Sequence, residues 1–82
     1  MTSLRKIKDV VIADEISRQK DGSILFRDGY FYRHGRTADE FRDDVVAALT
    51  KASIKYSVAD FGDHFVAPLA RSSHFYVRII LI

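Results

Sequence analysis

The stretch Thr37–Ala52, TADEFRDDVVAALTKA, decides the fold because it carries the signs of a capped amphipathic helix. Thr37 followed by Glu40 predicts a capping box, in which both side chains accept hydrogen bonds from backbone N–H groups that the helix itself leaves free. This pattern predicts a helix over Ala38–Ala52. Its apolar stripe recurs at three- and four-residue intervals and consists of Phe41, Val45, Ala48, Leu49 and Ala52.

The segments before this helix have the alternation and composition of strands. Val10–Gln19 and Ile24–Arg33 are both rich in β-branched or aromatic residues. Lys20–Ser23 between them contains Asp-Gly, a strong hairpin signal. Asp28-Gly29 interrupts the second segment and predicts a bulge there, because glycine inside a strand usually marks one.

The segments after the helix predict three more strands. Ile54–Ala59 alternates between apolar and polar residues, and Asp60–His64 has the composition of a turn. Phe65–Ala67 predicts a short edge strand that ends at Pro68, which cannot donate to a ladder. His74–Ile82 predicts the last strand. The order is ββαβββ, an α+β fold with a small, mainly antiparallel sheet and one amphipathic helix packed on one face.

Length and composition exclude several classes of protein. The 82 residues fit one domain spanning 1–82. The absence of cysteine excludes disulfides and thiolate metal sites and fits a reducing compartment. No apolar run approaches a signal peptide's core or a membrane span, so we expect a cytoplasmic protein. Asp60, Asp63 and His64 lack the ligand spacing of a closed metal site, and we expect neither a metal nor a cofactor.

One helix covers only one face of such a sheet, so half of the strand side chains need another environment. The parity of the strands predicts an outer face that is both apolar and basic, unlike a normal solvated face. Such a patch usually marks a binding surface or an oligomer contact. From that face we predict six partner-binding residues: Arg27, Phe31, Arg33, Tyr76, Arg78 and Ile80.

Two alternatives leave this face without a role. The bulge at Asp28-Gly29 would reverse the parity after it, placing Phe31 inside and Tyr30 and Tyr32 outside. The N-terminal segment could also fold over the outer face. In either case the supply of exposed apolar side chains would be smaller.

The run Arg33-His34-Gly35-Arg36-Thr37 lies between a predicted strand and the predicted helix. It resembles the Arg-His-Gly-x-Thr signature of the histidine phosphatase family, which implies that His34 is phosphorylated and Arg33 holds phosphate. The resemblance covers five residues, and the family's long α/β domain, with its second histidine, acidic proton donor and further arginine, has no counterpart here. We therefore expect no enzymatic activity and predict only an anion-binding cluster of Arg33, His34 and Arg36.

Two functions from different classes fit these features. The first is a protein-interaction module, an adaptor or inhibitor of the kind common among phage and mobile-element genes, which binds a protein partner or a second copy of itself. The second is a nucleic-acid-binding module in which Phe31 and Tyr76 stack on bases between arginines. The formal charge is only +2, and this slight excess counts against the nucleic-acid module.

Overall fold

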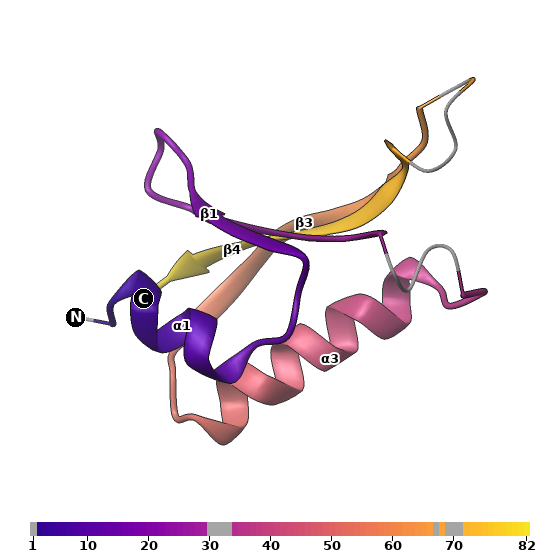
Figure 1. The fold of residues 1–82 in the computed structure, drawn as a ribbon. Coiled ribbons are helices and arrows are strands. Elements are labelled where there is room, and N and C mark those ends of the chain that lie inside the picture. The colour runs from indigo at the N-terminus through magenta and orange to yellow at the C-terminus, as the bar shows by residue number, and fades with distance from the viewer. Residues whose placement is uncertain (1, 30–33, 67, 69–71) are drawn as a thin grey trace.

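The computed structural model describes residues 2–29, 34–66, 68 and 72–82, and it confirms an α+β fold built on an antiparallel sheet. The sheet has four strands in the order β1-β2-β4-β3, and every neighbouring pair is antiparallel. Both labelled helices lie on the same face of it (Figure 1). The elements are α1 (Leu4–Val10), β1 (Glu15–Arg18), β2 (Ile24–Asp28), α3 (Ala38–Lys51), β3 (Tyr56–His64) and β4 (His74–Leu81).

Helix α3 confirms the helix predicted from the sequence, with Ala52 as its C-cap. The backbone N–H of Glu40 donates to Thr37 Oγ1 at 3.2 Å, and the backbone N–H of Thr37 donates to Glu40 Oε1 at 3.0 Å. Both halves of the capping box are therefore present. Phe41, Val45 and Leu49 of the apolar stripe are buried against the sheet.

Helix α1 is a second helix that the prediction of a single helix missed. The Ser3 hydroxyl caps it by accepting a hydrogen bond from the backbone N–H of Lys6 at 3.2 Å. Leu4, Ile7 and Val11 are spaced at helical intervals, and Ile7 is completely buried. The predicted strand Val10–Gln19 was therefore wrong in its first half, where the chain leaves α1 and crosses to β1.

The second predicted strand begins at Ile24 as expected, but β2 ends at Asp28. Its pairing with β1 and β4 is regular up to that residue, so the described part of the strand contains no bulge. The backbone N–H of Gly29 instead donates to Asp14 Oδ2 at 2.8 Å, which ties the end of β2 to the segment before β1. The remainder of that predicted strand, 30–33, lies outside the described residues. Phe31 belongs to this remainder, so the face predicted for its side chain stays a prediction.

Strand β3 corrects the predicted turn at Asp60–His64, because all five of these residues pair with β4. A register shift between Val58 and Asp60 leaves Ala59 as an extra residue, which places the bulge in this strand. Five strands were predicted and four are present among the described residues. Of the predicted edge strand Phe65–Ala67, Phe65 and Val66 are not in a strand, and Ala67 lies outside the described residues.

The core lies between the sheet and the two helices, and it uses the parity that the sequence predicted for β2 and β4. The N-terminal segment packs on this inner face, through Ile7 and Val11, and does not cover the outer one. The alternative in which it covers the outer face was therefore wrong. The buried apolar residues are Ile7, Val11, Ile24, Phe26, Phe41, Val45, Leu49, Ile54, Phe75, Val77 and Ile79.

Candidate functional site on the outer face of the sheet

The candidate site is the sheet face opposite the helices, which we call the outer face. The registers place side chains of this face in rows that cross all four strands. One row contains Glu15, Arg27, Tyr76 and Gly62, in the order of the sheet. The next row contains Ser17, Leu25, Arg78 and Asp60.

Arg27 is held by two partners on neighbouring strands. Its Nη1 lies 3.3 Å from Glu15 Oε2, and its Nε donates to His74 Nε2 at 3.2 Å. A guanidinium has no acceptor, so His74 Nε2 must accept, which leaves Nδ1 to donate to the carbonyl oxygen of Ser72 at 3.2 Å. The imidazole of His64 stacks on that of His74 with centroids 4.8 Å apart. Arg27 is thus part of a cross-strand network and not an isolated cation.

Arg78 is similarly balanced by a carboxylate. Its Nε is buried and lies 3.4 Å from Oδ1 of Asp60, close enough for an ion pair but not aligned for a hydrogen bond. The two arginines described on this face therefore each face an acid from the adjacent edge strand, Glu15 or Asp60. The face is less basic than the sequence predicted, because β1 and β3 contribute acidic and small polar side chains to it.

Tyr76 packs its ring over the glycine opposite it. A Cβ atom built on Gly62 would lie 3.3 Å from both Cε1 and Oη of Tyr76, so the ring occupies the space that a side chain at Gly62 would need. An aromatic side chain opposite a strand glycine shields the glycine backbone and helps to set the register. Tyr76 is consequently half-buried in this pairing.

The exposed apolar part of the outer face lies at its end, where β4 runs past β2. Ile80 is 49% exposed, and Ile82, just beyond the strand, is 81% exposed. Opposite Ile80 on β3 is the small side chain of Ser57. Of the six predicted partner-binding residues, the outer face thus contains Arg27, Tyr76, Arg78 and Ile80, while Phe31 and Arg33 lie outside the described residues.

Two members of the predicted anion-binding cluster, His34 and Arg36, are among the described residues, and both are exposed just before α3. The third, Arg33, lies outside the described residues. Arg36 Nε donates to Glu40 Oε2 at 2.9 Å. The backbone N–H of Thr37 and then Arg36 hold the pKa of Glu40 below its ordinary value, so this carboxylate stays ionised. An incoming anion would therefore compete with Glu40 for Arg36.

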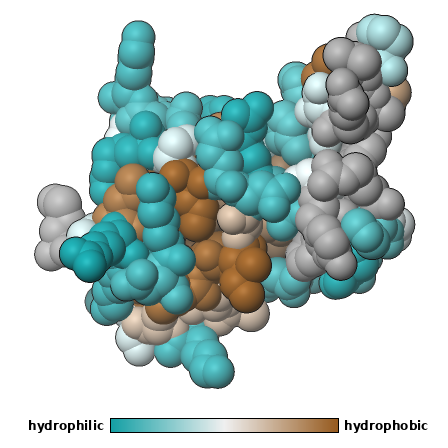
Figure 2. Space-filling model, viewed as in Figure 1, coloured by the Kyte–Doolittle hydropathy of each residue, from teal (hydrophilic) through white to brown (hydrophobic). Residues whose placement is uncertain are grey.

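A second exposed apolar surface was missed by the sequence reasoning. Figure 2 shows hydrophobic residues gathered over α1 and the segment that leads to β1, framed by hydrophilic ones. Ile12 in that segment is 91% exposed, and Val10, Ala13 and Ile16 near it are half-buried. The sequence analysis missed this surface because it placed Val10–Gln19 in a strand. The helical spacing of Leu4, Ile7 and Val11 after Ser3 was the signal that would have revealed it.

Comparisons with models of known protein families, with curated proteins and with solved structures found no match. Across the described ranges, no group of three or more histidine and acidic side chains is placed to hold a metal ion. No helix in the described part of the chain has the length and apolar content that crossing a membrane demands.

Proposed function

We propose that this protein is a non-enzymatic protein-interaction module, of the adaptor or inhibitor type, that binds a protein partner through the end of its outer face. The observation that carries the proposal is the 49% exposure of Ile80 on a face that neither α1 nor α3 covers. Ile82 extends the same apolar surface. Exposed apolar surface of this kind becomes favourable when a partner removes it from water.

The ion pairs favour a protein partner over a nucleic acid. Binding to a phosphate backbone relies on cations that are free to replace counterions. Arg27 and Arg78 are already paired with Glu15 and Asp60, at 3.3 Å and 3.4 Å. Stacking on bases requires an accessible aromatic ring, and the ring of Tyr76 is half-buried with one side packed on Gly62. A protein surface can use such a neutral, mixed face, since protein interfaces combine an apolar centre with a polar rim.

The test is capture of partners from the native cell with wild-type protein and two charge-introducing variants. Ile80→Glu places a carboxylate in the proposed interface, and Ile12→Glu makes the same change at an exposed isoleucine outside it. We expect Ile80→Glu to lose specific protein partners that Ile12→Glu and nuclease-treated wild type retain. Circular dichroism of both variants controls for folding.

Three outcomes would contradict the proposal. One is retention of every partner by Ile80→Glu, and a second is loss of all partners after nuclease treatment, which would favour nucleic acid. The third is an equal effect of Ile12→Glu. Light scattering on the same samples identifies a homodimer, since self-association that Ile80→Glu abolishes makes the partner a second copy of this chain.

A further inference from the structure

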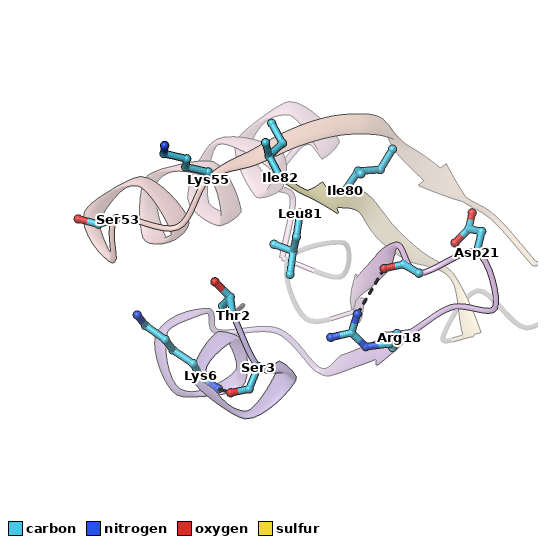
Figure 3. A pocket seen from close by; sticks show the side chains of 11 residues that line it. Thr2, Ser3, Lys6, Arg18, Asp21, Ser53, Lys55, Ile80, Leu81 and Ile82 are labelled. Atoms are coloured by element: carbon cyan, nitrogen blue, oxygen red, sulfur yellow. Dashed lines mark hydrogen bonds between the residues drawn. The ribbon is translucent and has the colours of Figure 1, made fainter.

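A groove of about 910 Å³ opens at the end of the sheet where β4 extends past β2. We call it the sheet-end groove. Its walls come from the start of α1, the β1–β2 turn, the segment between α3 and β3, and the end of β4. In Figure 3, the side chain of Leu81 points toward Thr2 and Lys6, while those of Ile80 and Ile82 point to the opposite side of β4, where Lys55 also lies. The groove therefore combines an apolar wall with side chains from four parts of the chain.

The charge in this groove is mostly positive. The basic side chains that line it are Lys6, Arg18 and Lys55, and the acidic side chain among the lining residues is that of Asp21. Figure 3 places Lys6 and Lys55 toward one end of the view and Arg18 with Asp21 toward the other. Neither lysine is part of an ion pair within the described residues. Lys6 and Lys55 therefore lie beside apolar surface, and no described acidic side chain forms an ion pair with either of them.

Asp21 does not neutralise the lysines, because it is turned into its own loop. Its Oδ1 accepts hydrogen bonds from the backbone N–H of Ser23 at 2.9 Å and from the Ser23 hydroxyl at 2.6 Å. Arg18, from the same hairpin, points its Nη1 toward the carbonyl oxygen of Gly22 at 3.5 Å, a long contact. The side of the groove bounded by α1 and Lys55 is the one that attracts a negative charge.

The backbone of β4 offers a further feature beside the apolar wall. The β2–β4 ladder ends at the pair Ile24 and Ile79, while on the other side Ile82 still donates to Lys55 O at 3.2 Å. Backbone groups of successive strand residues point to alternate sides, so those of Leu81 point away from β3, into the space beyond the end of β2. No described hydrogen bond joins Leu81 to the β1–β2 turn. An extended peptide is a ligand that can use such groups.

We propose that the sheet-end groove binds an acidic peptide segment, with a bulky apolar side chain against Ile80 and Ile82 and carboxylates near Lys6 and Lys55. This inference rests on the proposed function, since it takes the partner to be a polypeptide and names its chemistry. Charge complementarity selects the acidic residues and the apolar wall selects the hydrophobic one. The backbone groups of Leu81, which no described hydrogen bond joins to the β1–β2 turn, favour a peptide over a small anion.

The experiment measures binding of labelled peptides to the full chain by fluorescence anisotropy. The probes are a peptide of alternating Glu and Leu, the same peptide with Gln for Glu, and one with Ser for Leu. The protein variants are K6E/K55E in the groove and K8E/K51E as the control, which makes the same change of net charge at two exposed lysines outside it. Circular dichroism confirms that both variants are folded.

We expect the Glu-Leu peptide to bind more tightly than either altered peptide and to weaken as salt rises. An exposed ion pair changes affinity by up to about fivefold, so reversing both lysines should weaken binding about tenfold or more. K8E/K51E should bind within about twofold of wild type, because its lysines lie outside the groove. Ile80→Glu should weaken binding of the same peptide, because Ile80 lines the groove.

Several results would overturn this inference. They are absence of binding by the Glu-Leu peptide, equal binding of the Gln-Leu peptide, equal weakening by K8E/K51E, and tighter binding of a single-stranded oligonucleotide that K6E/K55E abolishes. Partner capture that depends on Ile80 but not on Lys6 and Lys55 would refute the binding of an acidic peptide and would leave the proposed function in place. A chain that captures no protein at all would refute the proposed function as well.

Discussion

Replacing Ile7 by alanine tests whether α1, the helix that the sequence reasoning missed, is part of the core. Ile7 is completely buried in the cluster that contains Phe26 and Phe41, whereas Ile12, five residues further on, is 91% exposed. Ile→Ala at both positions therefore makes one chemical change in two opposite environments. We expect a large loss of stability at Ile7 and almost none at Ile12.

The magnitude follows from the buried atoms. Ile7→Ala removes three carbon groups, worth about 2.4 kcal/mol at about 0.8 kcal/mol for each buried methylene. The remaining cavity brings the loss into the range of about 2–5 kcal/mol seen for such truncations. Small domains unfold with only about 5–15 kcal/mol, so this variant should lose a large fraction of its stability. Ile12→Ala should stay within about 0.5 kcal/mol of wild type.

The assay is equilibrium unfolding in urea, followed by far-ultraviolet circular dichroism. The midpoint should fall for Ile7→Ala while the denaturant slope stays constant, since both proteins expose similar surface on unfolding. Equal stability of the two variants would refute the packing of α1 on the core. It would also remove Lys6, which α1 carries, from its place at the sheet-end groove.

Three further predictions concern the capping box, the acid limb of stability and the glycine under Tyr76. Thr37→Ala should lower the free energy of unfolding by about 1 kcal/mol, because it removes the acceptor of the Glu40 N–H, while Thr37→Ser should retain most of it in thermal denaturation. An equal loss in both variants would contradict the cap. Hydrogen bonds from Thr37 and Arg36 lower the pKa of Glu40, so its contribution to stability is present above the ordinary pKa of glutamate and is lost as the pH falls below it. Glu40→Gln should therefore flatten the acid limb of a stability–pH curve, and an unchanged limb would argue against this assignment. Gly62→Val should destabilise the fold, since its Cβ would lie 3.3 Å from the Tyr76 ring, and Tyr76→Ala should relieve part of that loss. A double-mutant cycle should show coupling of at least about 0.5 kcal/mol, and additive effects would show that the ring does not occupy that space.

Alternation along a strand predicts which side chains share a face of the sheet, but not which side chains the neighbouring strands add to that face. The alternation in β2 and β4 correctly predicted that Arg27, Tyr76, Arg78 and Ile80 share a face. It could not predict which partners the neighbouring strands bring to that face, because Glu15 and Asp60 arrive through pairings with β1 and β3. The predicted basic patch consequently became two rows with paired charges.

By itself, the amino-acid sequence determined the elements whose signals act over a few residues. The capping box at Thr37, the apolar stripe of α3 and the alternation of His74–Leu81 depend only on periods of 3.6 and 2 and on local hydrogen bonds. At Asp28-Gly29 the same local chemistry predicted a bulge, whereas β2 ends at Asp28.

Only the tertiary structure decided the course of β3, the role of the N-terminus and the order of the strands. Asp60–His64 has turn composition, yet long-range pairing with β4 holds it extended, and Tyr76 covers its glycine. Ile7 is helical where it can fill the space beside α3. Ladder hydrogen bonds and core contacts join residues far apart in the chain, so the free energy that selects these conformations is absent from any short window of sequence.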